Sequence, residues 1–161
     1  MKNRVRQRAA ALTKDDEQRV VAAAVEAREH AYAPYSAFQV GAAILTSKGS
    51  LYTGCNVENA SYGATICAER AAVAAMVAAG EGRGASRPIL CAIVTGVAPP
   101  APPCGICRQV LVEFAHDLPL LLVTTSASKR GAHVAHVSTT RLSRLLPQAF
   151  HFETKRRPEN R

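Results

Sequence analysis

Apolar residues recur at helical spacing near the start of the chain. We predict a helix from Thr13, because Thr13-Lys14-Asp15-Asp16 resembles a capping box and places acids in the first turn. The apolar residues of this helix fall on one face as far as about Ala31: Val20, Val21, Ala24, Ala27 and Ala31. Pro34 cannot continue a helix, so we predict a loop over residues 32–37.

Five later apolar runs have the length of strands, and three other stretches have the pattern of helices. The strands are predicted over residues 38–45, 51–56, 89–97, 120–125 and 132–138, and the helices over 66–79, 105–115 and 140–145. Ser47-Lys48-Gly49-Ser50 suits a hairpin turn between the first two strands. The later strand–helix–strand units require right-handed crossovers, so part of the sheet is expected to be parallel. The pattern therefore predicts an α/β fold, a three-layer α/β/α sandwich with a mixed five-stranded sheet.

The length of 161 residues suits a single domain with a hydrophobic core. We expect its folded body to span about 13–150, and its basic ends, 1–12 and 153–161, to be flexible. The formal net charge is +8, but residues 1–8 carry +4 and residues 153–161 carry +2, which leaves +2 for the body. A nucleic-acid interface is more often a basic patch on the folded body, so this distribution argues against a nucleic-acid partner.

No apolar run reaches the length needed to cross a membrane, and residues 1–13 lack the apolar core of a secretory signal. We therefore predict a cytoplasmic protein that has no membrane partner. The Arg-rich, acid-poor start leaves an organelle transit peptide open as an alternative.

The sequence contains an odd number of cysteines, which argues against a fully paired disulfide framework: Cys55, Cys67, Cys91, Cys104 and Cys107. Cys67-Ala68-Glu69 opens one predicted helix, and Pro103-Cys104-Gly105-Ile106-Cys107 opens another. A cysteine or histidine two residues before a glutamate, together with Pro-Cys-x-x-Cys, is the signature of zinc-dependent deaminases. These motifs predict one Zn²⁺ ion bound by Cys67, Cys104 and Cys107.

The predicted ligand set is that of a catalytic zinc site. Three protein ligands leave a fourth position for water, and thiolates near helix N-termini are favoured by the helix dipole. Glu69 would lie beside the metal without binding it, where it can accept a proton from water and return it to the substrate. Three thiolates leave the site negative, so we expect Arg70 and Arg108 to offset this charge by hydrogen bonds to the sulfurs.

Five ordered segments of the chain resemble the cytidine deaminase family in its short form. They are Ala33-Pro34-Tyr35-Ser36-x-Phe38-x-Val40-Gly41-Ala42-Ala43, Gly54-Cys55-Asn56-Val57-Glu58-Asn59-Ala60-Ser61-Tyr62, Cys67-Ala68-Glu69-Arg70, Pro103-Cys104-Gly105-x-Cys107-Arg108-Gln109 and Leu145-Leu146-Pro147-x-Ala149-Phe150. The chain departs from the family at Ala64, where leucine is usual, and after Phe150, where glycine and proline usually follow. The resemblance implies hydrolytic deamination of cytidine and 2′-deoxycytidine to the uridine forms plus ammonia, as in pyrimidine salvage.

The resemblance also implies how the nucleoside binds. Asn56 and Glu58 would hold the ribose 3′-hydroxyl, and Phe38 would pack near the base and the sugar. The backbone around Ala68, with the Glu69 side chain, would read the edge of the pyrimidine. Such an enclosed pocket suits a free nucleoside better than a nucleotide within a strand.

The short form of the family usually assembles as a homotetramer, with one zinc ion per subunit. The resemblance implies that Tyr62 and Phe150 lie at subunit borders and that Phe150 reaches into a neighbour's site. We therefore expect a homotetramer whose sites are shared between subunits.

The residues leave other interpretations open. A deaminase of a cytosine-containing antibiotic such as blasticidin S shares the zinc motif, although Asn56-Val57-Glu58-Asn59 favours a ribose. A zinc-stabilised module that binds nucleosides without turnover would not need Glu69, and a deaminase of single-stranded nucleic acid would need a basic, aromatic channel. The three cysteines could also build a structural four-cysteine site with Cys55 or Cys91.

The remaining candidates are interpreted as packing or surface residues. We expect Gly41, Ala42 and Ala43 to allow close packing rather than phosphate binding, and Cys91 to be a small core residue. The histidines have no ligand spacing relative to the cysteines and are interpreted as surface or packing residues: His30, His116, His133, His136 and His151.

Overall fold

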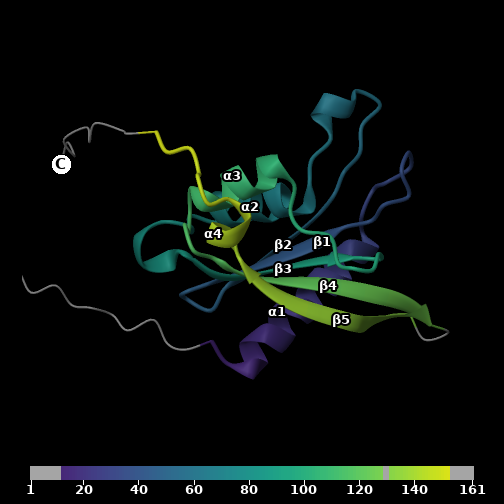
Figure 1. Ribbon diagram of the computed structural model, residues 1–161, viewed down its shortest axis with the longest axis horizontal. Helices are drawn as coiled ribbons and strands as arrows, with labels where there is room; N and C mark the ends of the chain where they lie inside the picture. Colours follow the sequence, from purple (N-terminus) through teal and green to yellow (C-terminus); the bar gives the residue numbers. More distant parts are fainter. Residues whose placement is uncertain (1–11, 129–130, 153–161) are drawn as a thin grey trace, which may run out of the picture.

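The computed structural model describes residues 12–128 and 131–152, and its elements follow the predicted order (Figure 1). The helices are α1 (Lys14–Glu29), α2 (Ala68–Ala78), α3 (Gly105–Val112) and α4 (Leu142–Leu145). The strands are β1 (Gly41–Thr46), β2 (Leu51–Cys55), β3 (Pro88–Thr95), β4 (Pro119–Ser128) and β5 (Gly131–Arg141). Two 3₁₀ turns, Tyr62–Ala64 and Gly84–Ser86, were not predicted.

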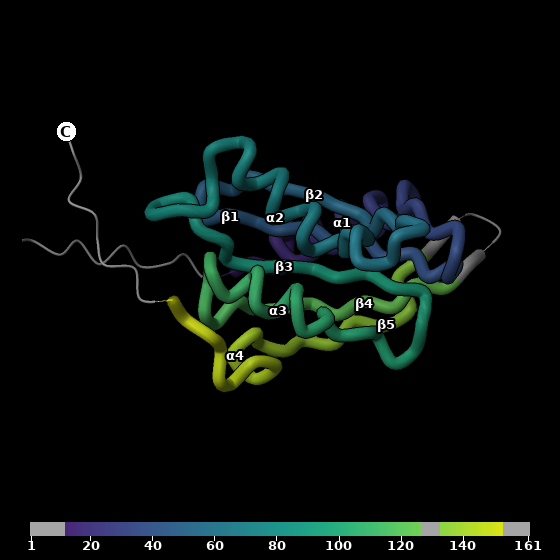
Figure 2. Tube along the Cα trace, turned by 90° about the horizontal axis from the view of Figure 1, so that it is seen from above, coloured from purple at the N-terminus to yellow at the C-terminus, as the bar shows by residue number. Residues whose placement is uncertain are grey.

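The five strands form one mixed sheet in the order β2-β1-β3-β4-β5. β3 and β4 are parallel, and all other neighbouring pairs are antiparallel. α1 packs on one face of the sheet, whereas α2, α3 and α4 cover the other (Figures 1 and 2). The predicted three-layer α/β/α fold with a partly parallel sheet is therefore confirmed.

β1 is buried along its whole length because both of its faces are covered. Ala42 and Ile44 join the core beneath α2 and α3, while Ala43 and Leu45 join the core beneath α1. This arrangement explains why the strand is a continuous apolar run instead of an alternating one.

Two glycines allow helices to approach the sheet closely. A Cβ atom at Gly41 would lie 2.1 Å from the Ala24 carbonyl oxygen of α1, and one at Gly54 would lie 2.4 Å from the Ala72 nitrogen of α2. Gly41 therefore allows α1 to pack closely on β1, as predicted for this residue. Gly54 likewise allows α2 to pack closely on β2. The N-terminus of α2 carries the first cysteine of the predicted zinc site.

Two predicted boundaries were wrong for reasons that bear on the site. The strand predicted from residue 38 begins at Gly41, because the Asn56 side chain accepts from the Val40 N–H and donates to the Phe38 carbonyl, both at 2.8 Å. The helix predicted from residue 66 begins at Ala68, because Ile66 forms an isolated bridge with Val57 instead.

Other boundaries differ toward the C-terminal half of the chain. α3 ends at Val112, three residues earlier than predicted, and both β4 and β5 are longer than predicted. The helix predicted over 140–145 starts only at Leu142, because Thr140 and Arg141 still pair with β4. The predicted flexible ends fall largely on 1–11 and 153–161, outside the described residues. Within 12–128 and 131–152, no helix is both long and apolar enough to cross a membrane.

Candidate active site

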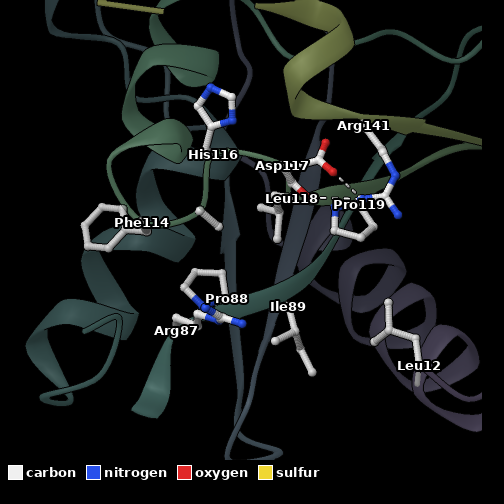
Figure 3. Close-up of a pocket in the computed structure, with 11 residues that line it drawn as sticks. Leu12, Arg87, Pro88, Ile89, Phe114, His116, Asp117, Leu118, Pro119 and Arg141 are labelled. Carbon is white, nitrogen blue, oxygen red and sulfur yellow. Dashed lines mark hydrogen bonds and ion pairs between the residues drawn. The ribbon is translucent and has the colours of Figure 1, made fainter. Parts of the chain in front are cut away.

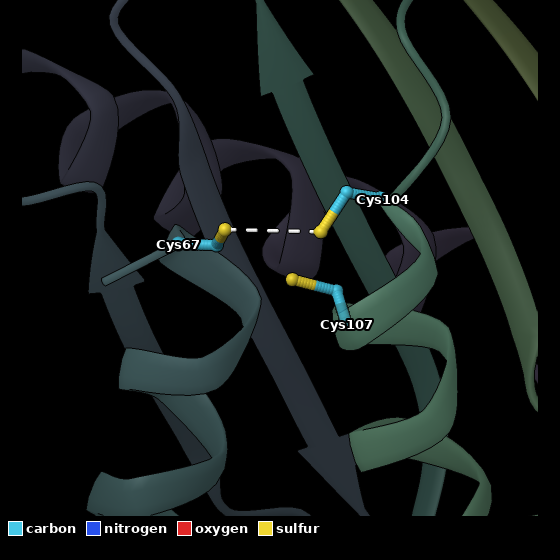
Figure 4. A group of neighbouring side chains, drawn as sticks. All are labelled: Cys67, Cys104 and Cys107. Atoms are coloured by element: carbon cyan, nitrogen blue, oxygen red, sulfur yellow. Dashed lines mark hydrogen bonds between the residues drawn. The ribbon is translucent and has the colours of Figure 1, made fainter. Parts of the chain in front are cut away.

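Three cysteine sulfurs meet where α2 and α3 begin (Figure 4). Cys67 is the N-cap of α2, Cys104 is the N-cap of α3, and Cys107 lies in the first turn of α3. Their Sγ atoms all lie within 4.8 Å of one another, and those of Cys67 and Cys104 are 3.9 Å apart. Two sulfurs bound to one tetrahedral zinc ion at about 2.3 Å lie about 3.8 Å apart, so the separation fits zinc.

The surroundings of the sulfurs favour an ionised thiol at Cys67. The Cys107 thiol beside it lowers the pKa of Cys67 to about 6; burial opposes this shift, whereas Cys104 and the Arg70 guanidinium add to it. The same contact with Cys67, together with burial, raises the pKa of Cys107. Metal ligation requires thiolates. An ionised Cys67 would therefore supply part of the negative charge that a divalent ion needs.

Glu69 is buried in the first turn of α2, with 4% of its surface exposed. Burial is the main cause that raises the pKa of its carboxyl group, and the nearby Cys67 sulfur adds to the shift. A raised pKa favours the protonated form of a buried carboxyl group, which can pass its proton to a bound molecule.

Asn56 and Glu58 follow β2 and connect it to the loop of residues 33–40. Both are 8% exposed. Glu58 accepts hydrogen bonds from the backbone N–H of Tyr35 and Ser36 and from the Ser36 hydroxyl. The Ser36 hydroxyl is the main cause that lowers the pKa of Glu58, so this carboxylate stays ionised.

A cavity of about 400 Å³ joins these groups. That volume is within the range of small-molecule sites. Six of the predicted residues line it together: Phe38, Asn56, Glu58, Tyr62, Ala68 and Glu69. Cys67 and Cys104 also line it, so the metal group and the predicted sugar-binding residues face one space.

Sequence reasoning missed several residues that line this cavity: Ser36, Val40, Thr65, Ile93, Thr95, Ala101 and Pro102. Thr95 could have been found, because it lies near the carboxyl end of the strand predicted over 89–97, and ligands in α/β sheets bind at the carboxyl ends of strands. Ser36 lies inside a motif that the sequence singled out but received no role there.

The two arginines next to the metal group lie in different surroundings. Arg70 donates from Nη2 to the Thr65 carbonyl at 2.6 Å, and its buried Nε has no hydrogen-bond partner within the described part of the chain. Arg108 donates to the carbonyls of Pro103, at 2.8 Å, and Leu145, at 2.9 Å. Arg70 thus has an unused donor beside Cys67, whereas Arg108 ties the start of α3 to α4.

Tyr62 and Phe150 are exposed aromatic residues. Tyr62 is 85% exposed at the edge of the cavity, and Phe150 is 68% exposed outside it. Gln109 of α3 donates to the Phe150 carbonyl at 2.8 Å, which fixes the backbone of the segment after α4.

Known proteins resemble most of this chain. Residues 14–120 match the family model described as the cytidine and deoxycytidylate deaminase zinc-binding region. The cytidine deaminase of Halalkalibacterium halodurans is 43% identical over 136 residues, which are 84% of this chain and 94% of that protein. The cytidine deaminase of Mycobacterium tuberculosis is 45% identical over 127 residues, which are 79% and 84% of the two chains.

The chain belongs to the cytidine deaminase family. The crystal structure of the cytidine deaminase from Burkholderia pseudomallei matches with a TM-score of 0.74 and 41% identity, covering 86% of this chain and all of that one. Membership of this family confirms the resemblance found in the sequence. It also shows that the chain is an enzyme. It also makes zinc the metal of the three-cysteine group.

The other cysteines and the histidines lie outside this zinc group in the described residues. Cys91 is fully buried in β3, as predicted, and the Cys55 thiol donates to the His30 carbonyl at 3.4 Å. All five histidines are exposed. A structural four-cysteine site is therefore not formed.

A second cavity, of about 610 Å³, is larger but lacks the family's zinc chemistry (Figure 3). Pro88, the first residue of β3, lines it, whereas Thr95 at the other end of β3 lines the cysteine cavity. Its rim carries the exposed ion pair of Arg141 with Asp117, at 2.6 Å. No cysteine lines it, so we assign the active site to the smaller cavity.

Proposed function

We propose that the chain catalyses the hydrolytic deamination of cytidine and 2′-deoxycytidine to uridine and 2′-deoxyuridine plus ammonia, and that the reaction depends on zinc. One observation carries the proposal: the buried carboxyl group of Glu69, whose pKa is raised by burial, borders the same cavity as the cysteine group. We further propose that the reaction serves pyrimidine salvage in the cytoplasm.

A zinc ion held by Cys67, Cys104 and Cys107 would supply Lewis acidity, which lowers the pKa of a water molecule. Glu69 first gives its proton to N3 of the base, which makes C4 more electrophilic. It then accepts a proton from the water that attacks C4 and delivers it to the leaving amino group. The raised pKa of Glu69 supports this shuttle, since the residue must both give and take a proton near neutral pH.

We assign binding of the sugar to Asn56 and Glu58. The Asn56 side chain accepts one hydrogen bond and donates one within the chain, so one amide hydrogen and one lone pair are left for a ligand. The ionised Glu58 can accept from the 3′-hydroxyl, and a hydrogen bond to a charged group is stronger than one between neutral groups. Both ribose and deoxyribose carry this hydroxyl, which supports activity on both nucleosides.

We assign binding of the base to the start of α2 and to Phe38. The Ala68 backbone and the Glu69 carboxyl group border the cavity and would bind the polar edge of the pyrimidine, while Phe38 offers an apolar surface to base and sugar. We propose that Arg70 offsets the negative charge of the thiolates, supported by its unused Nε donor and by its attraction to Cys67. Arg108 would assist by holding α3 in place.

The experiment follows the change in ultraviolet absorption from cytosine to uracil, with ammonia release as a check, in the zinc-loaded protein. We expect cytidine turnover, and a loss of about a thousandfold or more in Glu69→Gln, which cannot shuttle the proton. Metal analysis of the variant should find zinc retained, because Glu69 is not a ligand.

Each other outcome has a defined meaning. Loss of zinc from Glu69→Gln would make Glu69 mainly structural. Turnover of blasticidin S but not of cytidine would replace the proposed substrate by a cytosine antibiotic, and binding of cytidine without turnover would indicate a non-catalytic module.

A further inference from the structure

The loop that borders the sugar side of the cavity contains a residue in an uncommon backbone conformation. Ala37 has a φ of 55°, in the left-handed region that residues other than glycine seldom adopt. It stands between Ser36 and Phe38, which both line the cavity. Such a conformation persists only where the surroundings hold it in place.

The Ser36 hydroxyl supplies that hold. Its oxygen accepts a hydrogen bond from the Phe38 N–H at 3.0 Å, which closes a turn around Ala37. The same hydroxyl donates its proton to Oε1 of Glu58. One side chain thus links the backbone of Phe38 to the carboxylate proposed to bind the sugar.

The hydrogen bonds of Glu58 leave little freedom for this carboxylate. Its Oε2 atom accepts from the N–H groups of Tyr35, at 2.9 Å, and Ser36, at 3.2 Å, which uses both of its lone pairs. Its Oε1 atom accepts from the Ser36 hydroxyl, so one lone pair remains there for a ligand. The hydroxyl bond therefore decides which of the two Oε1 lone pairs is left for a ligand.

We propose that Ser36 is a positioning residue that gives the enzyme its selectivity for nucleosides carrying a 3′-hydroxyl. Its hydroxyl occupies one lone pair of Glu58 Oε1 and leaves the other for the 3′-hydroxyl. The inference rests on the proposed function, since it assumes that Glu58 binds the sugar. It adds a determinant of sugar selectivity to the reaction without adding a catalytic group.

The test compares cytidine with 3′-deoxycytidine, which lacks the hydroxyl in question. Ser36→Ala should lower kcat/KM for cytidine by about tenfold, mainly through a higher KM, because an oriented bond to a charged group is lost. The same variant should change kcat/KM for 3′-deoxycytidine by less than about twofold. Ser36→Thr, which keeps the hydroxyl, should restore most of the activity on cytidine.

Ser143→Ala is the matched control, because the Ser143 hydroxyl also donates to a carboxylate, that of Asp117, outside the cavity. It should leave the preference between the two nucleosides unchanged. Equal losses on both nucleosides in Ser36→Ala, or no loss on either, would overturn the proposal. So would a Ser36→Ala effect that persists in full in the Glu58→Gln background, since Ser36 is proposed to act through Glu58.

Hydrogen exchange separates this inference from the proposed function. In Ser36→Ala and in Glu58→Gln, the amide hydrogens of residues 35–38 should exchange faster than in the wild type, with or without substrate. Unchanged exchange would refute the link between the loop and Glu58. If the wild-type protein failed to deaminate cytidine while exchange responded as expected, the proposed function and the selectivity role would fail together, and only the structural link would stand.

Discussion

Two carboxyl groups share the active-site cavity, and their surroundings shift their pKa values in opposite directions. Burial raises the pKa of Glu69, whereas the Ser36 hydroxyl and the Tyr35 N–H lower that of Glu58. One carboxyl group is thereby suited to carry a proton and the other to accept hydrogen bonds as an anion. The two roles follow from the neighbours of each residue, because the side chains are chemically identical.

The lowered pKa of Glu58 predicts how sugar recognition depends on pH. Its carboxylate is ionised above its ordinary pKa of 4.5, and its contribution is lost only as the pH falls through the lower value in the folded protein. Preference for cytidine over 3′-deoxycytidine should therefore hold down to about pH 4.5 and decline below it. In Ser36→Ala, which lacks the main cause of the shift, the decline should begin at higher pH. Identical pH profiles of the preference in both proteins would contradict this assignment.

The two arginines of the site should respond differently to removal. Arg70→Ala should weaken zinc binding by about tenfold, because the guanidinium lies beside Cys67 and offsets its charge. Arg108→Ala should mainly lower thermal stability, since its bonds go to the Pro103 and Leu145 carbonyls. Competition with a zinc chelator and thermal unfolding would measure both effects. Unchanged zinc affinity in Arg70→Ala would refute the charge-offsetting role.

Single residues could be predicted from the sequence where their chemistry is local. The three cysteines and Glu69 stood out because ligand type and spacing carry the information. Ser36 did not, since its importance depends on Glu58, a residue 22 positions away that only the fold brings into contact. Thr65 was missed as well, although its carbonyl accepts from Arg70, which is only five positions away.

At the scale of elements, the site depends on where α2 begins. Gly54 of β2 meets the backbone of α2 so closely that a Cβ atom would lie 2.5 Å from the Ala68 carbonyl oxygen. Gly54→Ala should therefore push α2 outward, destabilise the fold by about 1–3 kcal/mol and weaken zinc binding through Cys67. Gly63→Ala is the control, because nothing lies within 4 Å of the added atom. Thermal unfolding and zinc affinity equal to the control would contradict this account.

Elements with a strong periodic pattern were predicted well, and their ends were predicted less well. The capping box at Thr13 fixes the start of α1, because its hydrogen bonds are local. The start of β1 could not be predicted, since the Asn56 side chain takes the backbone bonds of Phe38 and Val40 that a neighbouring strand would otherwise take. The parallel pairing of β3 with β4 followed from the order of elements alone.

At the scale of the whole molecule, several large apolar side chains remain exposed in the single chain. Tyr62, Ile106, Phe150 and Phe152 are among them. The family resemblance implies a homotetramer, in which exposed apolar side chains could be buried between subunits. We therefore propose that these side chains are covered by neighbouring subunits.

Phe150→Ala should separate assembly from folding. Its side chain is exposed and lies outside its own chain's cavity, so its removal should leave the secondary structure of the chain unchanged while lowering turnover. Light scattering and kinetics across protein concentration would measure the oligomeric state and activity together. A fully active monomer would refute shared sites, and so would a tetramer whose activity is unaffected.

Asn56 belongs at once to the sheet and to the cavity, and this limits how the enzyme can be redesigned. Its side chain makes two hydrogen bonds to the backbone just before β1, so a replacement that alters the proposed sugar recognition also removes these bonds. Libraries that seek new sugars are better directed to Phe38 and Tyr62, which border the cavity without hydrogen bonds from their side chains in the described structure. Because the structural bonds and the proposed sugar contact belong to one residue, we expect new specificities to arise by substitutions near Asn56 before Asn56 itself is replaced.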